Sequence, residues 1–237
     1  MTKEYHIWDA VFIPECREFV VQPDQASGSE LLALRQRLQN DLARYADYFC
    51  DLLGSHGVSI TADITPAYAG LGPEHLTRIY EDFERRGVDC KFIFLMRDPV
   101  ERCWSATRMK KSVESDLYGK RPDEEILPTY FKTTDARFRT DYRQTIMALD
   151  AAVPSENVYY GIYEEMMQPE QIEALSRFIG IKPDPKFSGR IFNAFPKTEV
   201  ISMATRRAVA AEYRHVYEFC AVRFPRTRTL WNSMDSV

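Results

Sequence analysis

Residues 91–111 read KFIFLMRDPVERCWSATRMKK, and this stretch decides the expected fold. Residues 91–96 are rich in β-branched and aromatic side chains, which is typical of a buried strand. Arg97 ends the strand, and Asp98-Pro99 starts a helix, because Asp is a favoured N-cap and Pro fits the first helical position. Glu101 stands where the acid of a capping box reaches back. The stretch therefore predicts a strand that leads directly into a capped helix.

A strand that feeds a helix is half of a βαβ unit, and ligands bind such sheets at the carboxyl ends of the strands. Arg97 stands at that end. Ser105 lies two turns into the helix, with Arg102 and Arg108 at i−3 and i+3 on the same side. A guanidinium, a hydroxyl and a helix N-terminus together suit a phosphate group. The alternative is an ordinary strand-end salt bridge and a helix-surface serine.

The arrangement resembles the 3′-phosphate-binding element of sulfotransferases that use PAPS (3′-phosphoadenosine 5′-phosphosulfate). In that family an apolar strand precedes the pattern Arg-Asp-Pro-x-x-Arg-x-x-Ser, and residues 97–105 match it in type and spacing. The resemblance is to bacterial-type enzymes related to carbohydrate and heparan sulfate sulfotransferases. It implies an α/β fold of the P-loop NTPase-like type, with a parallel sheet flanked by helices. It also implies that Arg97 and Ser105 hold the 3′-phosphate of PAPS and of its product PAP.

Residues 3–9, KEYHIWD, resemble the family segment Lys-Glu-x-His-Phe-Phe-Asp, which lines the acceptor site in relatives. The resemblance implies that Glu4 is the catalytic base, with His6 and Asp9 assisting it or positioning the substrate. An attacking hydroxyl must lose its proton, and a carboxylate or imidazole within hydrogen-bond reach can accept it. The alternative is a polar chain end with no role.

Residues 63–68, DITPAY, resemble the family form Glu-Lys-Thr-Pro-x-Tyr. The Thr65-Pro66 pair favours an extended turn after a short strand expected at 58–62. Asp63 is expected either to bind the acceptor or to cap a turn. The sequence departs from the pattern at Ile64, where glycosaminoglycan sulfotransferases have a lysine near the transferred group. A final resemblance concerns Lys197, because relatives fold a basic loop from this region over the nucleotide; a surface lysine is the alternative.

The remaining elements follow from hydrophobic periodicity and from helix-ending residues. One long helix is expected from Ser29, with an apolar stripe that runs to Leu52. Further helices are expected at 73–86, at about 140–152, at 169–179 and at 205–222. A strand is expected at 157–163, and a short one at 18–22.

Composition supports one domain over residues 1–237, because 45% hydrophobic residues in 237 can bury one substantial core. The net charge of −4 argues against a general nucleic-acid binder. The five cysteines include no CxxC pair, so neither a disulfide framework nor a metal site is expected. No apolar run suggests a membrane span, and the N-terminus does not resemble a signal peptide, so a cytoplasmic location is expected. The expected partner is a small-molecule or carbohydrate acceptor.

One part of the family pattern is absent. Relatives carry a loop of the form Gly-x-x-Lys-x-Gly-Thr-Thr upstream of the Lys-Glu-x-His segment, and this loop holds the 5′-phosphosulfate. Here only three residues precede Glu4, and none of the ten glycines lies in such a motif. A truncated sulfotransferase and a shortened relative without catalysis would both explain this. We expect weak or no transferase activity from these 237 residues, because the loop supplies the main electrostatic stabilisation.

Two other functions fit the same architecture. The first is a non-catalytic protein that binds PAP or another nucleotide, or that serves interaction alone. The second is a small-molecule kinase, which should need a Walker lysine and Mg²⁺ ligands that the sequence does not show.

Overall fold

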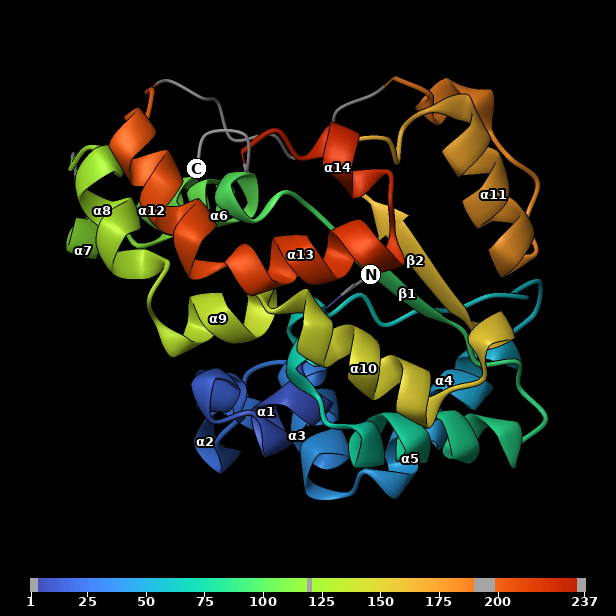
Figure 1. Cartoon of the computed structure of the whole chain (residues 1–237). Coiled ribbons are helices and arrows are strands. Elements are labelled where there is room, and N and C mark those ends of the chain that lie inside the picture. Colours follow the sequence, from blue (N-terminus) through green and yellow to red (C-terminus); the bar gives the residue numbers. More distant parts are fainter. Residues whose placement is uncertain (1–3, 119–120, 190–198, 234–237) are drawn as a thin grey trace. The chain divides into compact units, whose positions relative to one another are not determined.

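The computed structural model describes residues 4–118, 121–189 and 199–233 of the chain. The fold is mixed α/β and mostly helical, with a small parallel sheet of two strands (Figure 1). The chain forms two compact units. The first unit is Met1–Lys91 with Gln144–Val158, and the second is Phe92–Arg143 with Tyr159–Val237. The single domain expected for 1–237 stays a prediction.

The first unit is built from short helices around an aromatic core. Helix α3 packs on α4, α4 packs on α5, and α1 contacts α3. At the centre, Tyr45 and Phe49 each pack edge to face on Phe83 and lie tilted against one another. The elements are α1 (Trp8–Phe12), η1 (Pro14–Phe19), α2 (Pro23–Ala26), α3 (Glu30–Asn40), α4 (Ala43–Leu53), η2 (Pro66–Gly70), α5 (Pro73–Glu84), residues 144–152 of α10 (Tyr142–Ala152) and η3 (Ser155–Asn157).

The second unit contains the sheet and the helix α6 that continues from it. Helix α6 packs against α8, α9 and α12. Strands β1 and β2 lie side by side in Figure 1, and the N–H of Tyr163 donates to the carbonyl of Met96 at 2.7 Å. The elements are β1 (Phe92–Met96), α6 (Pro99–Val113), α7 (Ser115–Tyr118), α8 (Asp123–Tyr130), α9 (Thr134–Thr140), β2 (Val158–Ile162), α11 (Pro169–Ile179), η4 (Pro185–Phe187), α12 (Met203–Glu212), α13 (Arg214–Arg223) and α14 (Thr227–Leu230).

The predicted strand and capped helix are confirmed. Asp98 Oδ1 accepts hydrogen bonds from the backbone N–H groups of Val100 (2.9 Å) and Glu101 (3.3 Å), as an N-cap should. The capping box is wrong, because the N–H of Asp98 donates to Glu164 Oε1 at 3.0 Å. Glu101 instead pairs with Arg97 and Arg206. A carboxylate from outside the helix has thus taken the place that Glu101 was expected to fill.

Both long helices expected from the sequence are broken in the structure. The helix from Ser29 divides into α3 and α4, because Asp41 is extended (φ −143°) and its side chain accepts from the N–H of Ala43. The last helix divides into α12 and α13 at Tyr213. An apolar stripe in the sequence shows which side chains are buried. It does not show a break, because the stripe continues from one helix to the next.

Two expected strands are wrong. Residues 18–19 belong to η1, and the N–H of Val21 donates to the side chain of Gln39 at 2.9 Å rather than to a strand. Residues 58–62 form no strand. The helices at 73–86 and 169–179 and the strand at 157–163 are confirmed as α5, α11 and β2. Across the described ranges, no helix is both long and apolar enough to cross a bilayer.

Candidate functional site

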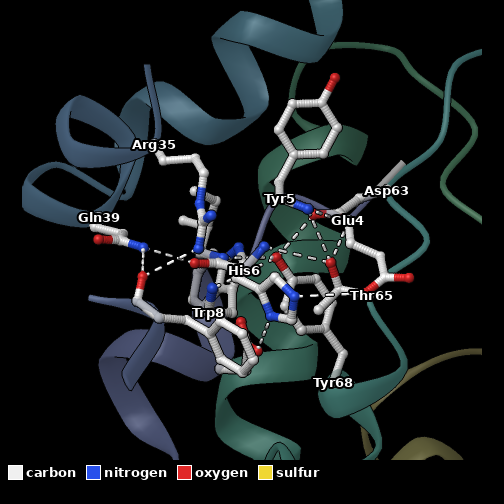
Figure 2. Close-up of polar contacts among 12 residues, drawn as sticks. Glu4, Tyr5, His6, Trp8, Arg35, Gln39, Asp63, Thr65 and Tyr68 are labelled. Carbon is white, nitrogen blue, oxygen red and sulfur yellow. Dashed lines mark hydrogen bonds and ion pairs between the residues drawn. The ribbon is translucent and has the colours of Figure 1, made fainter. Parts of the chain in front are cut away.

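The first candidate site is the segment 4–9 of the first unit, which side chains of residues 65–68 and of α3 hold in place (Figure 2). The N–H groups of residues 5 and 6 donate to Thr65 Oγ1 at 3.1 and 3.4 Å, and those of residues 7 and 8 donate to Tyr68 OH at 3.3 and 3.4 Å. Gln39 Nε2 donates to the carbonyl of His6 at 2.7 Å. These bonds fix His6 at φ 53°, a left-handed conformation that is costly for a non-glycine residue. Residues 5–8 are therefore anchored through their backbone.

The carboxylate of Asp63 fixes the Thr65 and Tyr68 hydroxyls, which in turn bind the backbone of the segment 4–9. Its carboxylate accepts from Thr65 Oγ1 (2.6 Å), Tyr68 OH (2.8 Å), Tyr45 OH (3.1 Å) and the N–H of Tyr5 (3.4 Å). Burial raises the pKa of Asp63, and the hydrogen bonds from these groups oppose that rise. Asp63 thus orients the Thr65 and Tyr68 hydroxyls. Binding of an acceptor by Asp63 stays a prediction.

Glu4, His6 and Asp9 form a row that runs from the surface into the interior. His6 Nδ1 lies 2.6 Å from Asp9 Oδ2, and His6 Nε2 lies 3.5 Å from Glu4 Oε2. The exposed fractions of the three side chains are 40% for Glu4, 12% for His6 and 0% for Asp9. The His6 ring also stacks on Phe19, with ring centroids 3.8 Å apart. Contacts on both nitrogens and on one face hold the imidazole in a single orientation.

This row can move a proton. The Asp9 carboxylate at Nδ1 favours the tautomer that carries its proton on Nδ1. Nε2, which faces Glu4, is then the nitrogen that can accept a proton. Asp9 has no exposed surface, so it can act on a substrate only through His6. In the described part of the chain, no group of three or more His, Cys, Asp or Glu side chains could hold a metal ion. The contacts at the two ring nitrogens lead us to interpret the row as a proton-transfer arrangement.

Sequence reasoning missed three residues that complete this site. Phe19, Arg35 and Gln39 come from η1 and from one face of α3, at i and i+4. Gln39 Nε2 and Arg35 Nη2 each donate to the carbonyl of Phe19 at 3.0 Å. Burial lowers the pKa of Arg35, while the charge of Asp9 raises it. Polar residues at helical spacing on an otherwise apolar face were the available signal.

The second candidate site lies at the end of β1 in the second unit and is centred on Arg97. Its guanidinium carbon lies 4.4 Å from the ring centroid of Tyr163, and Nη2 lies 3.5 Å from Glu101 Oε2. The backbone of Arg97 is fixed by Tyr142, whose hydroxyl donates to the Arg97 carbonyl at 2.8 Å. Arg97 Nε is buried and has no hydrogen-bond partner among the described residues. A buried donor without an acceptor suits an anionic ligand.

The other residues expected near Arg97 have different environments. Ser105 is partly exposed on α6. Arg102 Nη1 donates to Tyr130 OH (3.3 Å) of α8 and to Thr140 Oγ1 (3.1 Å) of α9. Lys197 lies outside the described residues, and Ile64 is 58% exposed in the first unit.

The N-terminus of α6 is not itself open to a phosphate, contrary to expectation. The Asp98 carboxylate caps its first N–H groups and also accepts from Tyr217 OH at 2.8 Å. A cavity of about 380 Å³ beside this end is lined by one arginine, Arg206, against three carboxylates, those of Asp98, Glu101 and Glu164, and by Met203, Leu230, Asn232 and Ser233. Burial raises the pKa of Glu164, and hydrogen bonds, including that from the N–H of Asp98, oppose the rise. An anion is therefore better placed farther along α6.

Comparisons with known proteins add no relative. A scan against protein-family models, a search of curated proteins and a search of solved structures each found no match.

Proposed function

We propose that this chain is a sulfotransferase that moves a sulfuryl group from PAPS to a hydroxyl of an acceptor molecule. The observation that carries the proposal is the row of Glu4, His6 and Asp9, with distances of 3.5 and 2.6 Å at the two ring nitrogens. The family pattern names these same residues for proton removal. The proposal includes the P-loop NTPase-like fold, of which β1, β2 and α6 would be part.

In this proposal the proton of the acceptor hydroxyl passes first to Glu4, the most exposed member of the row. His6 Nε2, 3.5 Å away, can take up the proton in turn. Asp9 then stabilises the imidazolium through its 2.6 Å contact with Nδ1. Such a positioned base contributes about 10²- to 10⁴-fold to a reaction rate.

PAPS would supply the activated sulfuryl group. Arg97 and Ser105 are the residues proposed to hold its 3′-phosphate, with Lys197 as a further contact. Arg97 fits that role, because its Nε has no hydrogen-bond partner in the described part of the chain and its backbone is fixed by Tyr142. Nothing in residues 1–237 matches the lysine-containing loop that holds the 5′-phosphosulfate in relatives.

The test is transfer of ³⁵S from PAPS to a sulfated oligosaccharide, a tyrosine peptide and 2-naphthol. We expect slow transfer to one of them, at least about 100-fold slower in His6→Asn, because Asn tolerates the left-handed backbone but cannot accept the proton. The matched control is His215→Asn, since His215 is an exposed histidine of the second unit. Transfer by the control at the wild-type rate is part of the expected result.

Two other outcomes would each rule out sulfuryl transfer as the function. Selective PAP binding without transfer to any acceptor would instead establish the non-catalytic nucleotide-binding alternative. Absence of both transfer and PAP binding would overturn the proposed function.

A further inference from the structure

We propose that Arg108 is a second anion-binding arginine, which acts with Arg97 and Ser105 on one phosphate or sulfate group beside α6. This inference deepens the proposed function, and rests on it only for the identity of the anion as the 3′-phosphate of PAP. The family pattern that ends at Ser105 assigns nothing to Arg108.

Arg108 is a buried cation, and two of its three donor nitrogens have no hydrogen-bond partner among the described residues. The residue is 8% exposed and its guanidinium lies over Trp104, with the guanidinium carbon 4.8 Å from the ring centroid. Its Nε and Nη1 are both buried without a hydrogen-bond partner among the described residues. Burying a charge with unpaired donors is costly, so proteins normally pair such a group. An anion would supply the missing acceptors.

Arg97 lies just before α6 begins, and Arg108 lies in the third turn of the helix. Arg206 connects their surroundings, because its Nη1 lies 3.4 Å from Glu101 Oε1 and its guanidinium carbon lies 5.3 Å from the ring centroid of Trp104. Arg97 extends forward to Glu101, whereas Arg108 folds back over Trp104, the usual direction for a long side chain on a helix. Ser105 lies between them, one turn before Arg108. The two guanidinium groups repel each other: burial lowers the pKa of Arg108, and the positive charge of Arg97 lowers it further.

The local charge favours an anion. Glu101 is shared by two arginines, Arg97 at 3.5 Å and Arg206 at 3.4 Å, so one carboxylate faces several cations. Asp123 raises the pKa of Arg108, but its oxygens already accept from Trp104 Nε1 (2.8 Å) and Lys111 Nζ (3.4 Å). A doubly charged phosphate could take paired hydrogen bonds from both guanidinium groups.

The experiment uses Arg108→Met, which keeps the apolar length of the side chain and removes its charge. Thermal unfolding is measured with sodium phosphate, sodium sulfate and PAP, each against sodium chloride of equal ionic strength. Because the open charge is removed, we expect the unliganded variant to melt at the same or a higher temperature than the wild type. We expect the stabilisation by phosphate, sulfate and PAP to be lost, with PAP affinity about 10- to 100-fold weaker.

Two controls separate charge from geometry. Arg177→Gln removes one positive charge from α11, where Arg177 is exposed and paired with Glu173, and should leave anion binding unchanged. Arg108→Lys keeps the charge without the planar fork and should restore binding only in part.

The outcomes distinguish this inference from the function it deepens. If PAP binds the wild type and Arg108→Met equally well while Arg97→Gln loses binding, Arg108 has only a structural role and the inference fails. If phosphate and sulfate stabilise the protein through Arg108 but PAP adds nothing, the anion site stands and the proposed function fails. If no anion stabilises the wild type, the inference is overturned.

Discussion

Among single residues, His6 is central to the first candidate site, together with the groups that hold its backbone in the left-handed conformation. The sequence pattern pointed to Glu4, His6 and Asp9, and the structure brings them together. Pattern alone could not show that Asp63 accepts four hydrogen bonds, because its partners come from segments 5, 45, 65 and 68. The sequence pattern also could not identify Phe19, a residue of η1 that stacks on the His6 ring. The spacing of residues in the sequence can indicate which side chains form a site. Which other side chains contact them depends on packing between distant segments.

Asp9 should fix the tautomer of His6. The 2.6 Å contact predicts that neutral His6 carries its proton on Nδ1. In Asp9→Asn the amide no longer imposes that choice, so both tautomers should be populated. Nitrogen-15 NMR of the imidazole measures the two nitrogens directly. A wild-type ring protonated on Nε2 would contradict the proposed row.

Asp63 should make stability depend on acidic pH. Burial raises its pKa above 3.8, so the folded state favours the protonated form. The corresponding stabilisation is fully present below pH 3.8 and is lost as the pH rises through the raised pKa. Asp63→Asn should be less stable throughout but should lack this slope.

Urea unfolding at a series of pH values from about 3 to 6 measures that slope as a change in the free energy of unfolding. Asp24→Asn provides the control, since Asp24 is exposed in α2. An equal pH slope in Asp63→Asn and the wild type would show that Asp63 is not its source.

At the scale of elements, α6 was predicted well because its signals are local. An apolar strand, an N-cap and a proline lie within nine residues of one another, and each acts on its own backbone. The breaks at Asp41 and Tyr213 were missed because both helices on either side bury the same stripe. The expected strand at 58–62 failed for a different reason: β propensity produces a strand only where a partner supplies ladder hydrogen bonds.

Asp98→Ala should destabilise the protein by about 1.5–5 kcal/mol. The variant loses an N-cap, worth about 0.5–2 kcal/mol, and leaves the buried Tyr217 hydroxyl without its acceptor, at about 1–3 kcal/mol. Chemical denaturation measures the difference. Thr133→Ala is the matched control, because Thr133 caps α9 through one bond to the N–H of Ala136 and should cost only about 1 kcal/mol. Equal losses in the two variants would show that Asp98 does no more than cap α6.

At the scale of the whole molecule, sequence reasoning obtained the α/β class but overestimated the sheet. It expected a parallel sheet flanked by helices, and the structure has one parallel pair with helices around it. The two compact units could not be read from the sequence, because each is made of segments far apart in the chain. Periodicity shows which residues are buried but not which segments share a core.

PAP should protect the two units differently. Its proposed 3′-phosphate contacts lie on β1 and α6, so local opening there should become rarer when PAP is bound. Hydrogen exchange at short times should slow in residues 92–113 and change less in α4 of the first unit. Protection confined to α4 would place the nucleotide elsewhere.

The most direct test of the central claim is calorimetric titration of the protein with PAP and with adenosine 5′-phosphate, repeated with Arg97→Gln. The two ligands differ by the 3′-phosphate, the group that Arg97 is proposed to hold. We predict that PAP binds the wild type at least about tenfold more tightly than adenosine 5′-phosphate, and that Arg97→Gln removes the difference. Equal affinity of the wild type for both ligands, or a preference that survives in Arg97→Gln, would contradict the account.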